Sequence, residues 1–351
     1  MSCRPLVSII LPVYNGEAWL DSCLQSISEQ THNGPMELCV FNDASTDRSM
    51  EKIEEHKQAL NDVNIAVIIT THENESTGPK GCGYAKNKAV QSSSGNYLCF
   101  LDADDVMHPD RIRMQFEVAE SLPKNTLLGC QVVREPVDST VRYSKWINKL
   151  SQDQLYSQIY TSNGPTVVMP TWFCHRFLFD TVGEFDEGGK GVPEDYLFFL
   201  KLLSKNGKLH RVDRALLTYR HHPTATTMSI SEETIWKIRL QNLQENVLSK
   251  WSGFTIWNAG KQGRKFYRDL REETKEKVIC FCDVDPKKIS KRYYIHELSH
   301  KVPKPKVPIL HFSEAPKPFI ICVKLDLTGG AFEENLSSLN LKEGVDYFHF
   351  N

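Results

Sequence analysis

The chain has 351 residues, of which 40% are hydrophobic and 25% are charged, and its formal net charge is −2. This length predicts two domains with separate cores, and the composition is that of an ordinary globular protein. The near-neutral charge excludes a protein whose whole surface is built to bind nucleic acid or an anionic membrane. The charge is nevertheless uneven, because residues 254–306 carry 14 basic and 7 acidic side chains.

The first hundred residues alternate between strand and helix patterns. Strands are expected at residues 6–12, 37–41, 63–70 and 97–101, and helices at residues 18–28, 47–60 and 83–92. In the first of these helices Leu20, Leu24 and Ile27 recur at spacings of three and four residues, as on one face of a helix. Repeated strand–helix–strand units predict a parallel, doubly wound sheet.

The rest of the chain is less regular. Helices are expected near residues 109–121 and 196–205, and strands near residues 127–134, 166–169, 254–257, 278–282 and 319–325. An apolar stripe that includes Trp236, Leu240 and Leu243 indicates a helix that connects the two parts. We therefore predict a catalytic domain at residues 1–228, a connecting helix at 229–253 and a small Rossmann-like α/β module at 254–351.

Ten cysteines are scattered along the chain, and no pair has the spacing of a zinc site. Reduced thiols of a cytoplasmic protein are the simplest interpretation. The apolar stretch at the N-terminus is too short for a membrane span and lacks the layout of a signal peptide. No membrane association is therefore expected.

An acidic segment follows the fourth expected strand. Asp102, Asp104 and Asp105 lie at its carboxyl end, where open α/β sheets bind their ligands. Carboxylates this close repel one another, so they require a compensating cation. A hard divalent metal shared with a diphosphate is the partner that we expect, and the alternative is a solvated acidic turn.

Other polar motifs lie at strand ends or helix starts on the same edge of the predicted sheet. In chain order the motifs are Pro12-Val13-Tyr14-Asn15, Asn42-Asp43-Ala44-Ser45-Thr46-Asp47, Ala85-Lys86-Asn87, Asp102-Ala103-Asp104-Asp105 and Glu194-Asp195. This order resembles the inverting family 2 glycosyltransferases with the GT-A fold, whose signatures read PVYN, DDGSTD, ARN, DADD and ED. The resemblance covers about residues 5–225 and implies an α/β domain that binds a UDP-sugar.

The resemblance implies a nucleotide-sugar site made by Pro12, Tyr14, Asn15, Asp43, Lys86 and Asp102. Asp43 is expected to accept from the uracil N–H, and Asp102 to face the ribose or the uracil. Asn42 stands where the family has its first aspartate, which leaves recognition to Asp43. Lys86 replaces an arginine, so it keeps a positive charge for the diphosphate but loses the bidentate geometry.

The resemblance also implies the catalytic groups. Asp104 and His222 are expected to hold Mn²⁺ or Mg²⁺, and Asp195 to act as the general base of an inverting displacement. Glu194 and Trp172 are expected to contact the acceptor or the donor sugar. The alternatives are a structural histidine at 222, a helix-start pair at 194–195 and a core aromatic at 172.

The C-terminal module contains a segment similar to a dinucleotide-binding fingerprint. Asn258 replaces its first glycine, and Asp283 ends the next strand near the place of the usual acid. An NAD-dependent oxidoreductase is therefore a rival interpretation, although residues 254–351 are short for that fold. Basic residues interleaved with tyrosines favour instead a module for assembly or for gripping RNA, and a solvated face is the alternative. These residues are Lys261, Arg264, Lys265, Arg268, Lys287, Lys288, Lys291 and Arg292, with Tyr267, Tyr293 and Tyr294.

Four longer segments are similar to a tRNA-acting member of the same family. These are residues 164–174, 188–199, 254–264 and 321–336. The similarity implies UDP-galactose as the donor and queuosine in the anticodon of tRNA-Tyr as the acceptor. The alternatives are transfer from UDP-GlcNAc to a galactose-terminated glycan and a non-catalytic sugar or RNA binder. Retention of the four aspartates at 43, 102, 104 and 195 argues against a binder, because a binder needs no base.

Overall fold

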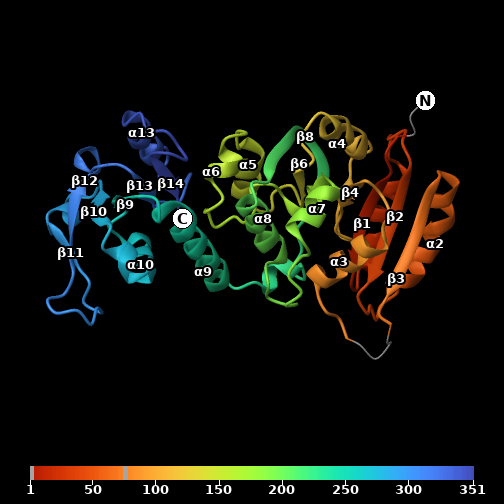
Figure 1. The fold of residues 1–351 in the computed structure, drawn as a ribbon, viewed down its shortest axis with the longest axis horizontal. Coiled ribbons are helices and arrows are strands. Elements are labelled where there is room, and N and C mark those ends of the chain that lie inside the picture. The colour runs from red at the N-terminus through yellow and green to blue at the C-terminus, as the bar shows by residue number, and fades with distance from the viewer. Residues whose placement is uncertain (1–3, 74–77) are drawn as a thin grey trace. The chain divides into compact units, whose positions relative to one another are not determined.

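The computed structural model describes residues 4–73 and 78–351 (Figure 1). The chain forms two units. The N-terminal unit comprises Met1–Gln152 and Pro165–Ser231, and the C-terminal unit comprises Asp153–Gly164 and Glu232–Asn351. The helix that was expected to connect two domains thus belongs to the C-terminal unit, and the division of function at residues 228 and 253 stays a prediction.

The first half of the N-terminal unit is the predicted parallel sheet. Its strands are β1 (Val7–Val13), β2 (Met36–Asn42), β3 (Ile65–Thr71) and β4 (Tyr97–Phe100), in the order β3-β2-β1-β4, and its helices are α1 (Glu17–Ser28), α2 (Ser49–Asp62) and α3 (Cys82–Ser92). Every residue of β1 and β2 is buried, which explains their continuous apolar runs. α1 packs on α2, whereas α3 packs on β1 and β2. The α/β class is confirmed.

The second half extends the sheet with three antiparallel pairs and one parallel pair. Beyond β4 the order continues as β7 (Phe173–His175), β6 (Thr126–Glu135), β8 (Lys208–Arg220) and β5 (Val106–Met107), and the helices here are α4 (Arg111–Glu120), α5 (Val141–Lys149), α7 (Arg176–Val182) and α8 (Glu194–Ser204). The pairs β4–β7, β7–β6 and β8–β5 are antiparallel, and the pair β6–β8 is parallel. The strand predicted at 166–169 is wrong. Residues 166–168 precede the 3₁₀ turn η1 (Met169–Thr171) and Met169 begins it, because Pro165 and Pro170 supply no donor for a ladder. The strand follows at β7.

Strand β8 escaped prediction because charged residues interrupt its apolar pattern. Arg211 is buried and its guanidinium donates to the carbonyl oxygens of Ile147 and Leu150, each at 2.6 Å. A register shift in the pairing of β8 with β6 further breaks the alternation of inward and outward side chains. β8 matters for the site because it delivers Arg220 and the residues after it to the sheet edge that carries the acidic segment.

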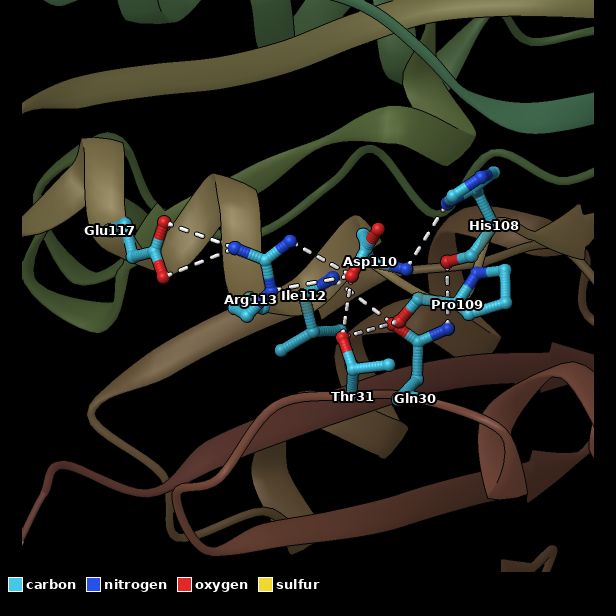
Figure 2. A network of polar contacts seen from close by, with 8 residues as sticks. All are labelled: Gln30, Thr31, His108, Pro109, Asp110, Ile112, Arg113 and Glu117. Carbon is cyan, nitrogen blue, oxygen red and sulfur yellow. Dashed lines mark hydrogen bonds and ion pairs between the residues drawn. The ribbon is translucent and has the colours of Figure 1, made fainter.

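A polar network attaches the chain beyond the acidic segment to the end of α1 (Figure 2). The Gln30 side chain donates to the His108 carbonyl oxygen at 2.9 Å and accepts from the Ile112 N–H at 3.0 Å. The Thr31 hydroxyl donates to the Asp110 carboxylate at 2.7 Å. Both ends of the acidic segment are therefore anchored, one in β4 and the other at α1.

The C-terminal unit has a sheet of its own. Its order is β11 (Tyr293–Ile295), β12 (Lys306–His311), β10 (Val278–Asp283), β9 (Phe254–Trp257), β13 (Phe319–Ile321) and β14 (Tyr347–His349), and only the pair β11–β12 is antiparallel. Its helical segments are α6 (Gln154–Ser157), α9 (Glu232–Leu243) with the π turn η3 (Gln244–Leu248), α10 (Lys261–Asp269), α11 (Glu272–Lys275), α12 (Pro286–Ile289) and α13 (Ala331–Ser338). The predicted second α/β sheet is confirmed.

Two general expectations concern the cysteines and the membrane. The nine cysteines in the described ranges are free, and eight of them are buried. None of the helices within residues 4–73 and 78–351 is long and apolar enough to cross a membrane.

Candidate active site

The loops that follow β1 and β2 are joined by hydrogen bonds between side chains and backbone N–H groups. The Asn15 N–H donates to the Ser45 hydroxyl at 3.0 Å, and the Thr46 N–H donates to the Asn15 side-chain oxygen at 2.8 Å. Asn15 has a φ of 50°, a left-handed conformation that asparagine tolerates better than most residues. The Glu17 N–H likewise donates to the Asp47 carboxylate at 3.0 Å. The structure therefore places Asn15 as the link between two loops of the predicted nucleotide site.

Pro12 and Tyr14 occupy different environments. Pro12 lies inside β1, opposite Phe41, and is buried. Tyr14 follows the strand and is 51% exposed, so its ring is available to a ligand. Of the two, only Tyr14 offers a side chain at the surface of the site.

Asp43 is buried at the end of β2 and is already hydrogen-bonded. Its carboxylate accepts from the backbone N–H of Lys80 at 2.9 Å and of Gly81 at 2.7 Å, and it lies 2.8 Å from His72 Nε2. The His72 ring stacks on Tyr84, with centroids 5.5 Å apart. Asp43 therefore holds the approach to α3 against the sheet, and its recognition of uracil stays a prediction. Sequence reasoning missed His72, although its place just after β3 put it at the same sheet edge.

The acidic segment forms a cluster. Oxygen atoms of Asp102, Asp104 and Asp105 lie within 4.8 Å of one another. Burial raises the pKa of Asp102 to about 6; the Lys86 ammonium opposes this shift and the Asp104 carboxylate adds to it. Burial also raises the pKa of Asp105 well above its usual range, although its carboxylate accepts from the Arg220 N–H at 2.9 Å. Holding these carboxylates together therefore costs folding free energy.

His222 joins this cluster from a position 118 residues away. Its Nε2 lies 2.8 Å from Asp104 Oδ2, and its Nδ1 lies 2.8 Å from the Thr224 hydroxyl. Its ring stacks on Trp19, at 4.9 Å between centroids, and the Arg220 guanidinium lies 5.3 Å from the same indole. The structure therefore brings together the two residues expected to ligate a metal, and it adds Trp19, which sequence reasoning missed, as their support.

The cluster suits a hard divalent cation. Among the described residues, Asp102 Oδ1 and Asp105 Oδ2 are buried and have no hydrogen-bond partner. Buried carboxylate oxygens without a donor are costly, and a cation would compensate them. Carboxylate oxygens with one imidazole nitrogen are a donor set that fits Mn²⁺ or Mg²⁺.

Lys86 and Glu194 form a buried ion pair beside the cluster. Lys86 Nζ lies 2.8 Å from Glu194 Oε1, and the two side chains are 2% and 11% exposed. Burial acts to raise the pKa of Glu194, but the Lys86 ammonium outweighs it and the pKa is lowered. Lys86 was expected to face the diphosphate and Glu194 the acceptor. The structure instead places each as the other's partner, so both contacts stay predictions.

Asp195 follows Glu194 in the first turn of α8. Its carboxylate accepts from the Tyr196 N–H at 2.6 Å. Burial, followed by the Glu194 charge, raises the pKa of Asp195 to about 7, against the lowering influence of Lys86. A carboxylate with a pKa near 7 is suited to accept a proton at neutral pH.

A stack of three side chains lies near these carboxylates and was not predicted. The Arg134 guanidinium lies 4.0 Å from the centroid of Tyr219 and 5.6 Å from that of Tyr143. Burial raises the pKa of Tyr143 to about 12; Arg134 acts against the shift and the Asp195 charge adds to it. No motif in the sequence linked β6, α5 and β8, so only the fold could bring these residues together.

Trp172 is a core residue, and the expectation that it contacts a sugar is wrong. Its side chain has no exposed surface, and its indole N–H donates to the Val167 carbonyl oxygen at 2.9 Å. The rings around it belong to Phe100, Phe185, Phe198 and Phe199. A sugar would find no free ring face there.

The fingerprint-like loop of the C-terminal unit is held by its own side chains. Asn258 has a φ of 119° and accepts from the Gly260 N–H at 2.7 Å. A Cβ at Gly263 would collide with the Asn258 carbonyl oxygen, so helix and strand approach closely, as in dinucleotide-binding folds. The Asp283 carboxylate, however, already accepts from the Ala259 N–H and, at 2.9 Å, from the Lys288 ammonium group. This acid is therefore occupied within the loop.

The fold and the site define a class of protein. An α/β sheet that is parallel through its first four strands, with an acidic cluster and a separate half-buried carboxylate at one end, is the arrangement of nucleotide-sugar-dependent glycosyltransferases. Residues 8–183, half of the chain, match the model of glycosyl transferase family 2. The chain belongs to this family.

Relatives and solved structures agree with this assignment. An uncharacterized glycosyltransferase of Rickettsia felis is 30% identical over 258 residues, which cover 71% of this chain and 38% of that protein. Uncharacterized glycosyltransferase EpsJ of Bacillus subtilis is 26% identical over 228 residues, which cover 64% of this chain and 63% of EpsJ. The chain thus spans less than two thirds of either relative.

Two solved structures have a similar fold at low sequence identity. S. aureus TarS 1–349 in complex with UDP-GlcNAc has a TM-score of 0.51 at 17% identity, covering 76% of this chain and 70% of that one. The mannosyltransferase PcManGT from Pyrobaculum calidifontis, in complex with GDP-Man and Mn²⁺, has a TM-score of 0.51 at 17% identity, covering 70% and 65%. At this identity the likeness shows the fold alone, and it confirms the predicted GT-A type.

Proposed function

We propose that the chain is a metal-dependent, inverting glycosyltransferase that uses a UDP-sugar. The observation that carries the proposal is the pairing of two kinds of carboxylate at one sheet edge. Asp104 lies against His222 in a cluster that has two buried carboxylate oxygens without a donor, whereas Asp195 is half-buried with a pKa of about 7. The first arrangement suits the diphosphate of the donor and the second suits the acceptor hydroxyl.

The chemistry follows from these positions. A cation held by Asp104, His222 and Asp102 would supply Lewis-acid stabilisation of the departing diphosphate. Asp195 accepts the proton of the acceptor hydroxyl as that oxygen bonds to the anomeric carbon and the bond from that carbon to UDP breaks. The attack comes from the face opposite UDP, so an α-linked donor gives a β-linked product. The Lys86–Glu194 pair holds the start of α8, and with it Asp195, in place.

We propose galactose as the sugar and queuosine in the anticodon of tRNA-Tyr as the acceptor. Support comes from residues 164–174, 188–199, 254–264 and 321–336, which are similar to queuosine-tRNA galactosyltransferase. The basic excess of residues 254–306 is the charge that an RNA acceptor calls for. The proposal places the reaction in the cytoplasm.

A second candidate is transfer of GlcNAc from UDP-GlcNAc to a galactose-terminated glycan. It is favoured by the likeness to TarS, whose structure holds UDP-GlcNAc. An NAD-dependent oxidoreductase is disfavoured, because the Asp283 carboxylate that a dinucleotide ribose would need is already hydrogen-bonded within its own loop.

The test is direct. Purified protein is incubated with Mn²⁺, queuosine-containing tRNA-Tyr and either UDP-galactose or UDP-GlcNAc. The mass of the anticodon nucleoside is then measured by mass spectrometry. We expect a hexose on queuosine with UDP-galactose alone, and none with the Asp195→Asn variant. No gain with either donor would refute the tRNA acceptor, and assays with galactose-terminated glycans would then decide whether the second candidate holds.

A further inference from the structure

A groove in the C-terminal unit lies between α10 and β11. It has a volume of about 370 Å³, is open to solvent, and is lined by Arg264, Arg268, Lys291, Tyr293, Tyr294 and Glu297, among others. Arg264 and Arg268 are four residues apart on α10, so they share one helix face. The groove thus has two guanidinium groups on one wall and an ammonium and two phenol rings on the other.

The cations of the groove differ from the other basic residues of this module. Lys265 lies 3.6 Å from the centroid of Trp236 and is paired with Asp269 at 2.9 Å, so it supports packing. Lys288 is likewise paired with Asp283, at 2.9 Å. Within residues 4–73 and 78–351, by contrast, no ion pair is found for the side chains of Arg268 and Lys291. The fold therefore separates two structural lysines from cations that face the groove.

The two tyrosines of the groove differ in packing and exposure. Tyr294 is held by Tyr267, edge to face at 5.7 Å, and the Arg264 guanidinium lies 5.4 Å from its centroid. Tyr293 is 51% exposed on β11, the edge strand of the sheet. One ring thus stiffens the wall, while the other presents a large surface to solvent.

We propose that this groove binds an unpaired segment of RNA, with Arg268 and Lys291 on the phosphates and Tyr293 stacked on a base. Guanidinium groups bind phosphate oxygens through paired hydrogen bonds, and exposed rings stack on splayed bases. An acidic peptide would satisfy the cations but leave Tyr293 without a stacking partner. An anionic membrane likewise offers no planar base on which Tyr293 could stack. Glu297, the only acid that lines the groove, keeps the phosphates toward the cationic walls.

That the RNA is the tRNA acceptor rests on the proposed function, whereas RNA binding itself does not. The probe is therefore a fluorescein-labelled transcript of tRNA-Tyr, which lacks queuosine and reports binding without transfer. The groove variant is Arg268→Gln with Lys291→Gln. The matched control is Lys250→Gln with Lys324→Gln, which removes two lysines of the same unit outside the groove. Circular dichroism confirms that both variants are folded.

Loss of two phosphate contacts has a calculable effect. Each contact to single-stranded nucleic acid contributes about 0.7 to the slope of log K against log salt, so its loss costs about fivefold at 0.1 M salt. We expect the groove variant to raise the Kd about 25-fold and to reduce the slope by about 1.4, with the control variant unchanged. Tyr293→Ala should raise the Kd about fivefold or more without changing the slope.

The outcomes separate this inference from the proposed function. Equal weakening in the groove and control variants, or none in either, would overturn the groove as an RNA site even if galactose transfer is observed. Loss of binding to phosphatidylserine vesicles with retained tRNA binding would assign the groove to membranes instead. The expected pattern without any sugar transfer would uphold the groove and overturn the proposed acceptor or activity.

Discussion

The buried pair of Lys86 and Glu194 allows a sharp test of how the site is held. In Lys86→Met the new side chain fills a similar volume, but it leaves the Glu194 carboxylate buried without its cation. Breaking one side of a buried pair costs about 3–5 kcal/mol. The pair has the required geometry, with 2.8 Å between Nζ and Oε1 and side-chain exposures of 2% and 11%. We therefore expect the free energy of unfolding to fall by about that amount.

The matched control is Lys88→Met on the same helix. Lys88 donates to the neutral side chain of Gln91 at 3.0 Å in an exposed position, so its loss should change stability by less than about 0.5 kcal/mol. Urea denaturation and thermal melting measure both variants. A double variant, Lys86→Met with Glu194→Gln, should recover part of the loss, because no buried charge remains.

The pH dependence of the folding stability tests independently whether the Lys86–Glu194 pair stabilises the fold. The pKa of Glu194 is lowered in the folded protein by Lys86, so the pair contributes stability above the unfolded pKa of the glutamate that is lost as the pH falls. In Lys86→Met the ammonium that lowers the pKa of Glu194 is gone while burial still acts to raise it, so the penalty should shrink as acidification protonates Glu194. Equal stabilities of Lys86→Met and Lys88→Met at neutral pH would refute the reasoning.

Three further predictions concern the site. Asp195→Asn should lower kcat about 10²–10⁴-fold with little change in the KM for the donor, and the kcat/KM of the unmodified enzyme should rise with pH through an apparent pKa near 7; a loss below tenfold would exclude Asp195 as the base. His222→Ala should raise the Mn²⁺ concentration for half-maximal activity about 10–100-fold, whereas the neighbouring His221→Ala should not. Equal effects of the two variants would show that the contact of His222 with Asp104 is not the cause. Trp172→Ala should destabilise the fold by about 3–5 kcal/mol in urea denaturation; a change confined to donor KM would restore a sugar contact.

Local sequence patterns predicted much of the first half of the protein. Strands β1 and β2 are buried along their whole length, so their apolar runs, bounded by turn residues, marked them clearly. Alternation of strands with amphipathic helices then required a parallel sheet, and this placed the polar motifs at one edge. The acidic segment Asp102–Asp105 is recognisable as a candidate site in the sequence itself, because its chemistry is contained in four consecutive residues.

Tertiary structure alone decided which distant residues meet. His222 reaches Asp104 across 118 residues, and Lys86 reaches Glu194 across 108. The first contact depends on β8 joining the sheet beside β6, and the second depends on α8 packing against α3. No local period encodes either arrangement. The same packing buried Trp172 completely, although its neighbours in sequence suggested a site residue. Sequence determined the types of group available at the sheet edge, whereas long-range packing determined their partners and their burial, and hence their charge.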